Sequence, residues 1–93
     1  MKRDYSKSRV VWTKHARDEV TEDNFKKQEI EESLSKVIEF PEFEDNKTRG
    51  IIKVGERYCT IIYKRMTNGI IIITCWESNP TDVREYYNVV RER

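Results

Sequence analysis

Several residue types are scarce in this 93-residue sequence, and each scarcity excludes a class of protein. Two cysteines are too few for a disulfide scaffold and indicate free thiols in a cytoplasmic chain. A single histidine leaves no ligand set for zinc, so neither a metal nor a small-molecule cofactor is expected. No run of about 18 apolar residues is present, which excludes a membrane-spanning helix. The first residues also lack the apolar stretch of a secretory signal.

Excess charge of one sign is missing as well. The 18 Lys and Arg residues nearly balance the 17 Asp and Glu residues, so net charge alone does not hold the chain on nucleic acid or a membrane. Only three glycines occur, and the sequence has no Gly-rich phosphate loop, Gly-x-Ser-x-Gly elbow or Cys-x-x-Cys motif. Nucleotide-dependent enzymes and serine-nucleophile enzymes are therefore poor candidates.

The first half of the chain has a mainly helical pattern. A short strand is expected over residues 9–13, and Thr13 is the N-cap of a helix over residues 14–22. A second helix is expected to end at Pro41. Its apolar stripe has helical spacing and consists of Ile30, Leu34, Val37 and Ile38.

The second half is strand-like and ends in a helix. The expected strands cover residues 48–54, 57–65 and 70–77, with two-residue turns at Gly55-Glu56 and Asn68-Gly69. Asn79 and Pro80 suit the N-cap and the first position of a helix that extends to residue 90. The order β-α-α-β-β-β-α predicts one α+β domain over residues 1–93, with a core at about 9–90 and its helices on one face of a small, mostly antiparallel sheet. The expected buried cluster consists of Ile30, Leu34, Ile38, Ile61 and Ile72.

Alternation along the strands divides the side chains between two sheet faces. The more apolar face carries Arg57 and Cys59 and is expected to meet the helices. The opposite face is a candidate basic and aromatic surface for RNA. It carries Lys53, Tyr58, Thr60 and Lys64, together with Cys75 and Glu77. Cys59 and Cys75 fall on opposite faces in this register, which argues against a disulfide between them.

Parts of the sequence resemble one family of uncharacterised domains in the RelE/ParE-like superfamily, close to the BrnT toxins. The resemblance spans residues 10–77. It is carried by Val11-Trp12-Thr13-Lys14-His15-Ala16, by Ile30-Glu31-Glu32-Ser33-Leu34 before Pro41, and by Ile72-Ile73-Thr74. It implies a RelE-like fold and a toxin of a toxin–antitoxin pair. A cognate antitoxin protein, and mRNA or the ribosome, are the partners that it implies.

The same resemblance implies site residues. Toxins of the RelE type that cleave RNA use Lys, Arg and Tyr side chains as acid, base and charge stabiliser, in place of a His/Glu pair. Arg57 matches an arginine of that type, and Arg84 followed by Tyr87 matches its arginine-then-tyrosine arrangement. The candidate RNA contacts are Lys53, Tyr58, Lys64 and Arg65.

Each candidate also has a purely structural interpretation. His15 lies in the first turn of a helix, where the dipole favours neutral imidazole, so it is either a catalytic base or a packing and capping residue. Strand lysines commonly discourage edge pairing, and tyrosines on an amphipathic helix commonly pack. Arg57 is assigned to the helix side by strand alternation, which conflicts with an open-site role unless a strand end or a β-bulge exposes it.

Two functions of different class therefore remain open, and so does the question of enzymatic activity. One is a RelE-like endoribonuclease toxin that holds RNA on the basic sheet face and the C-terminal helix. The other is a non-catalytic domain with the same fold that binds RNA or protein. A small antitoxin encoded beside the gene would favour the first.

Overall fold

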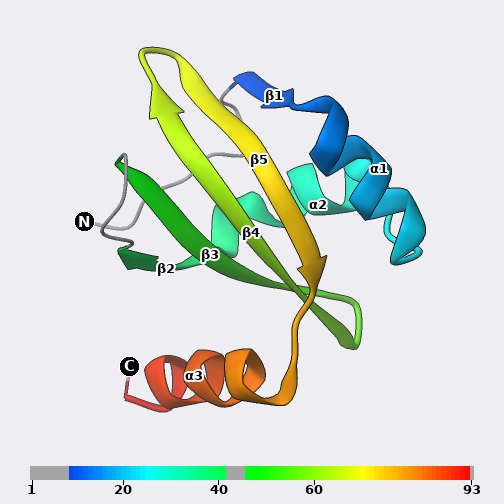
Figure 1. Cartoon of the computed structure of the whole chain (residues 1–93). Coiled ribbons are helices and arrows are strands. Elements are labelled where there is room, and N and C mark those ends of the chain that lie inside the picture. Colours follow the sequence, from blue (N-terminus) through cyan, green and yellow to red (C-terminus); the bar gives the residue numbers. More distant parts are fainter. Residues whose placement is uncertain (1–8, 42–45, 93) are drawn as a thin grey trace.

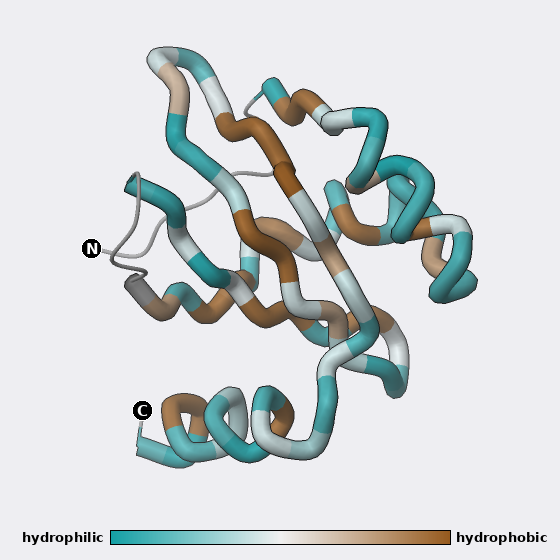
Figure 2. The backbone as a smooth tube through the Cα atoms, in the orientation of Figure 1, coloured by the Kyte–Doolittle hydropathy of each residue, from teal (hydrophilic) through white to brown (hydrophobic). Residues whose placement is uncertain are grey.

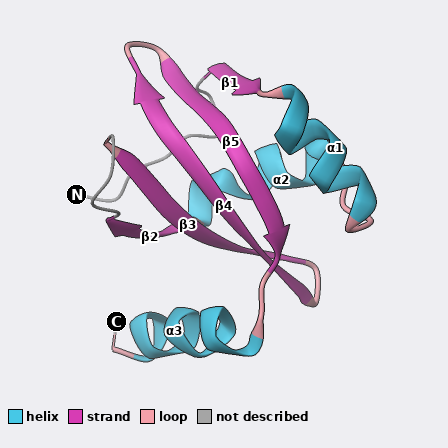
Figure 3. Cartoon of the chain, in the orientation of Figure 1, coloured by secondary structure: helices cyan, strands magenta, loops and turns pink. Residues whose placement is uncertain are grey.

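The chain folds into an α+β arrangement of one mixed sheet and three α-helices (Figures 1 and 3). The computed structural model describes residues 9–41 and 46–92. The strands are β1 (Arg9–Trp12), β2 (Ile38–Pro41), β3 (Lys47–Val54), β4 (Arg57–Met66) and β5 (Gly69–Glu77). The helices are α1 (Lys14–Glu22), α2 (Lys27–Ser33), the 3-10 turn η1 (Leu34–Lys36) and α3 (Pro80–Arg91).

The sheet has the strand order β1-β5-β4-β3-β2. β1 runs parallel to β5, with Val10 opposite Ile70, and all the other strand pairs are antiparallel. The long strands β3, β4 and β5 form the centre of the sheet, and the edge strands β1 and β2 have four residues each. Short edge strands leave little unpaired backbone for another chain to bind.

The predicted N-caps of the first and last helices are confirmed. The Thr13 hydroxyl accepts a hydrogen bond from the backbone N–H of Ala16 at 3.1 Å. The Asn79 side chain accepts one from the backbone N–H of Asp82 at 2.8 Å, with Pro80 at the first helical position. Both caps satisfy backbone donors that a helix leaves without intrahelical partners.

The second helix is shorter than its apolar stripe predicts. α2 ends at Ser33, one 3-10 turn follows, and Val37 is extended with a ψ of 138°. Residues Ile38–Pro41 then pair with β3 as an additional strand. The predicted helix is therefore wrong beyond Lys36, because pairing with β3 suits these β-branched and aromatic side chains and covers an edge of that strand.

The hydrophobic core lies between α1, α2 and one face of the sheet, which we call the first face (Figure 2). The helices contribute Ala16, Val20, Ile30 and Leu34. The strands contribute Ile52, Cys59, Ile61, Tyr63, Ile70, Ile72 and Cys75. Four of the five expected core residues belong to this cluster. Ile38 is buried outside it, opposite Ile51.

α3 lies on the other face of the sheet, the second face, apart from α1 and α2 (Figure 1). It contacts Arg49, Tyr58 and Thr60, which alternate along β3 and β4 with the core residues. The prediction that all helices cover one face is therefore wrong. The physical reason is that the Asp82 carboxylate of α3 receives hydrogen bonds from side chains of the second face.

The prediction that Cys59 and Cys75 lie on opposite faces of the sheet is wrong, because β5 contains a β-bulge. Ile62 pairs with Thr74 while its neighbour Tyr63 pairs with Ile72, so one residue of β5 is left over between those partners. The bulge reverses the alternation and brings Cys75 to the first face beside Cys59, where both are buried free thiols. The hydrogen bond with Cys75, followed by burial, raises the pKa of the Cys59 thiol.

Candidate functional site

Three tyrosines meet where α3 crosses the second face, and we call them the tyrosine cluster: Tyr58 of β4, and Tyr86 and Tyr87 of α3. Their ring centroids lie 5.1 Å (Tyr58–Tyr86), 5.7 Å (Tyr58–Tyr87) and 5.9 Å (Tyr86–Tyr87) apart, all with edge-on geometry. The hydroxyls of Tyr58 and Tyr87 form a hydrogen bond of 2.5 Å. Tyr87 remains 44% exposed, so the cluster offers an aromatic surface to solvent.

The hydrogen bond within the cluster makes the phenol of Tyr58 harder to ionise. The bond with Tyr87, followed by burial, raises the pKa of Tyr58 to about 12. A phenol is neutral at physiological pH even with its ordinary pKa of 10, and here the neutral form is favoured further. In this state Tyr58 can donate a hydrogen bond or stack on a ring, and it is not ready to act as a base.

Two cationic side chains flank the tyrosine cluster. Lys53 lies opposite Tyr58 on the neighbouring strand, with its Nζ 5.9 Å from the ring centroid of that tyrosine. Arg84 is exposed on α3, three residues before Tyr87 and therefore next to it on the helix surface. The structure thus brings together four residues that the sequence singled out: Lys53, Tyr58, Arg84 and Tyr87.

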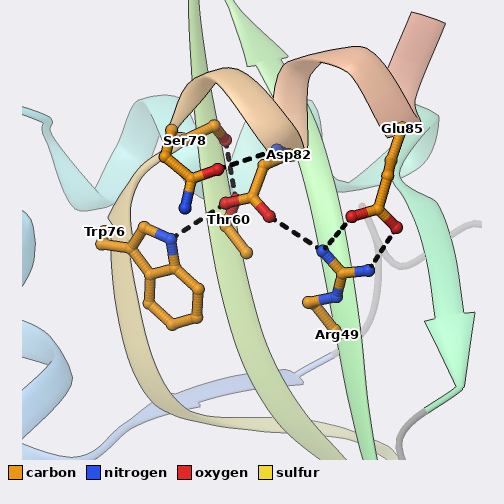
Figure 4. Close-up of polar contacts among 7 residues, drawn as sticks. Arg49, Thr60, Trp76, Ser78, Asp82 and Glu85 are labelled. Atoms are coloured by element: carbon orange, nitrogen blue, oxygen red, sulfur yellow. Dashed lines mark hydrogen bonds and ion pairs between the residues drawn. The ribbon is translucent and has the colours of Figure 1, made fainter.

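A buried polar network fixes α3 beside these tyrosines, and we call it the docking network (Figure 4). Its members are Arg49, Thr60, Trp76, Ser78, Asp82 and Glu85. Asp82, which is 5% exposed, accepts hydrogen bonds from Thr60 Oγ1 at 3.0 Å and Trp76 Nε1 at 3.1 Å. Ser78 joins the network through its hydroxyl, 2.7 Å from that of Thr60.

Arg49 connects the sheet to both carboxylates of α3. Its guanidinium lies 2.9 Å from Asp82 Oδ1 and 2.7 Å from Glu85 Oε2, and it also stacks 4.8 Å above the ring of Phe40. The sequence alone did not point to Arg49, Asp82 or Glu85. Strand alternation from Lys53 places Arg49 on the second face. Two acidic residues three positions apart on the last helix, Asp82 and Glu85, are the sequence signal that could have identified its partners.

The second face is strongly basic along its two central strands. β3 and β4 contain no acidic residue. Lys47, Lys53 and Lys64 project from the second face, and among the described residues no carboxylate lies within ion-pair distance of any of the three. Lys47 and Lys64 lie directly opposite each other, an arrangement of like charges that weakens strand pairing. We call these three residues the second-face lysines.

Arg57 lies on the first face, as strand alternation predicts, and is fully engaged there. Its guanidinium donates to Glu77 at 2.9 Å and to the backbone carbonyls of Asp23 and Asn24 at 2.6 and 2.9 Å. It also lies 3.9 Å from the centroid of the Phe25 ring. The hydrogen bond with Glu77 raises the pKa of Arg57 and lowers that of Glu77. Arg57 thus holds the connection between α1 and α2 onto the sheet.

The remaining candidates lie apart from the tyrosine cluster. The His15 side chain is 72% exposed on α1, with its Nε2 3.3 Å from Oε1 of Glu19. Glu19 also accepts hydrogen bonds from the Thr74 hydroxyl and from the backbone N–H of Cys75. Arg65 pairs with Glu39 at 3.0 Å near the far end of β4. His15, Arg57 and Arg65 are therefore not parts of one site with Tyr87.

Comparison of the chain with protein-family models, with curated proteins and with solved structures finds no significant match. Among the described residues, no three His, Cys, Asp or Glu side chains are grouped as metal ligands. Within the same part of the chain, no helix is both long and apolar enough to cross a membrane. The geometry of the second face is therefore the basis of the functional argument.

Proposed function

We propose that the chain binds single-stranded RNA on the second face, with the tyrosine cluster as a stacking surface and the second-face lysines as phosphate contacts. The observation that carries this proposal is the tyrosine cluster, in which Tyr87 is 44% exposed, with Lys53 beside Tyr58 and Arg84 next to Tyr87 on α3. Nucleic-acid bases stack on aromatic rings with little dependence on sequence, and basic side chains beside the rings hold the backbone. A net charge of +1 means that binding comes from this local surface.

The unpaired lysines give this proposal independent support. Lys47 and Lys64 face each other without a carboxylate among the described residues, at a cost to the pairing of β3 and β4. A bound phosphodiester would offset that repulsion. An apolar protein partner would not.

A labelled oligouridylate tests the proposal by fluorescence anisotropy. Replacing Lys53 by glutamine should weaken binding and reduce the log–log salt slope by about 0.7, the contribution of one phosphate contact on single strands. Lys36→Gln is the matched control, because Lys36 is exposed in η1, on the layer that covers the first face. Equal effects of the two substitutions, or no binding by the parent protein, would contradict the proposed site.

A RelE-like endoribonuclease toxin is the second candidate, and the phenol pair next to a guanidinium favours it. Tyr87 shares a hydrogen bond with Tyr58, and Arg84 lies next to Tyr87 on α3. Such a set can move a proton and neutralise charge on a phosphorane. This candidate implies a cytoplasmic protein with an antitoxin partner and with mRNA or the ribosome as target.

Cleavage of the bound oligonucleotide separates the two candidates. A nuclease that uses this site should lose at least about 100-fold in cleavage rate when Arg84 is replaced by alanine, with little change in stability. Tyr87→Phe should lose cleavage at an unchanged melting temperature if the phenol transfers a proton. If the parent protein binds the oligonucleotide and does not cleave it, the non-catalytic binding domain is the candidate that remains.

A further inference from the structure

The attachment of α3 to the sheet is unusual, because the one buried side chain of this helix is a carboxylate. That residue is Asp82, and α3 buries no apolar side chain completely. Val90 is 40% exposed and Tyr87 is 44% exposed. Helices of globular proteins normally derive most of their stability from a buried apolar face. α3 is held by the docking network together with the contacts of Tyr86 and Tyr87 with Tyr58. Hydrogen bonds and ion pairs such as those of the docking network can be exchanged for those of another anion.

Arg49 is the residue of the docking network through which such an exchange would occur. It projects from the second face of β3 between Lys47 and Lys53, two positions after the first and four positions before the second. Glu85 binds the guanidinium through both oxygens, at 2.7 and 3.4 Å, and Asp82 binds it at 2.9 Å. A planar, bidentate carboxylate is the geometric equivalent of two phosphate oxygens at a guanidinium.

We propose that Arg49 is a phosphodiester-binding residue whose ligand position is filled, in the free protein, by the Glu85 and Asp82 carboxylates of α3. RNA competes with these two carboxylates for Arg49, and their withdrawal joins Lys47, Arg49 and Lys53 into a continuous basic row on β3, while Tyr86 and Tyr87 stay packed on Tyr58. The hydroxyl of Thr60 and the indole N–H of Trp76, which now donate to Asp82, become available to the same ligand. This inference rests on the proposed RNA binding. It adds Arg49 to the RNA-binding surface and identifies the carboxylates of α3 as competitors of the RNA.

The competition predicts that removing a carboxylate of α3 strengthens RNA binding by more than its charge alone explains. Glu85→Gln keeps the size of the side chain and removes the ionic partner of Arg49. Glu92→Gln is the matched control, because Glu92 is exposed at the C-cap of the same helix and makes no ion pair with a described residue. Both substitutions change the net charge by one, so the difference between them isolates the competition for Arg49.

Anisotropy with the oligouridylate should show that Glu85→Gln binds at least about threefold more tightly than Glu92→Gln. Arg49→Lys, which keeps the charge and loses the bidentate geometry, should bind more weakly than the parent. In a Trp12→Phe background the emission of Trp76 should shift to longer wavelength when RNA binds, because its indole loses the Asp82 carboxylate. The same emission in the free variants verifies that each one is folded.

The outcomes separate this inference from the proposed function. Equal affinities of Glu85→Gln and Glu92→Gln, in a parent protein that binds RNA, would overturn the role of Arg49 and leave the proposed RNA binding in place. A Trp76 emission that RNA does not change would likewise overturn the inference, because Asp82 would then keep its place in the docking network. Absence of RNA binding by the parent would overturn both.

Discussion

The docking of α3 through a buried carboxylate gives a sharp prediction about stability. Replacing Asp82 by alanine removes the carboxylate that accepts from Thr60 and Trp76, and it removes one of the two α3 carboxylates that bind Arg49. Removing one partner of a buried ion pair costs about 3–5 kcal/mol when the other charge stays buried. Here the cost has an upper limit, because α3 can leave the sheet and allow the three donors to bind water.

The free energy that docks α3 sets that limit, since no apolar side chain of the helix is fully buried. We expect Asp82→Ala to lower the free energy of unfolding by about 1–3 kcal/mol, the range for unsatisfied buried polar groups. The first-face core should remain folded, because it is built without α3. Hydrogen exchange should then show fast exchange for the backbone N–H groups of residues 81–91 and continued protection in β4 and β5.

Asp18→Ala is the control, because Asp18 is exposed on α1 and has no hydrogen bond or ion pair with a described residue. It should leave both the free energy of unfolding and the protection of α3 unchanged. Undiminished protection of α3 in Asp82→Ala would refute the reasoning, because the helix would then depend on other contacts. Simultaneous loss of protection in β4 and β5 would refute it as well, because α3 would then be part of the cooperative core.

Three further predictions concern single positions. Leu34 is fully buried, so Leu34→Ala should lower the free energy of unfolding by about 2–4 kcal/mol in urea denaturation, and a loss of a few tenths would contradict its place in the core. In an absorbance titration Tyr58 should ionise near pH 12, because its hydrogen bond with Tyr87 and its burial favour the neutral phenol. Tyr87→Phe should move that ionisation toward the ordinary value of 10, and an unshifted titration would count against the bond. Arg57 lowers the pKa of Glu77 from its ordinary 4.5, so the ion pair stabilises the fold above that value and the contribution is lost as the pH falls through the lowered pKa. Glu77→Gln should therefore destabilise the protein at pH 7 and not at about pH 2, whereas an equal deficit at both would show that the ion pair is not the cause.

Local signals predicted the helix caps and the turn at Gly55-Glu56, whereas the second hairpin turn lies at Thr67-Asn68, one residue before the predicted Asn68-Gly69. The N-caps at Thr13 and Asn79 are correct, because capping involves residues only three positions apart. The second helix is wrong beyond Lys36 because its apolar stripe suits either a helix or a strand, and only the edge of β3 decides between them. The bulge in β5 has no local signature in the sequence. For that reason Cys75 was assigned to the wrong face.

The same distinction between local and long-range signals applies to the candidate site. Strand alternation correctly separated Arg57 from Tyr58, since the two neighbours point to opposite faces of β4. The sequence could not show that α3 crosses the second face, because this placement depends on long-range bonds from Thr60 and Trp76 to Asp82. The tyrosine cluster, which unites two segments far apart in the chain, follows from that placement alone.

The near-zero net charge of the chain conceals a separation of charge in space, and α3 is central to it. The two strands that form the middle of the second face, β3 and β4, carry cations and no acid, so acidic side chains reach that face from other elements. α3 supplies Asp82 and Glu85, and both bind Arg49, whereas the second-face lysines have no ion-pair partner among the described residues. A surface used only for folding gains little from leaving like charges opposite each other while one neighbouring arginine receives two carboxylates. The same distribution is expected of a surface that binds an extended polyanion, with its arginine occupied by two carboxylates of α3 until the ligand arrives.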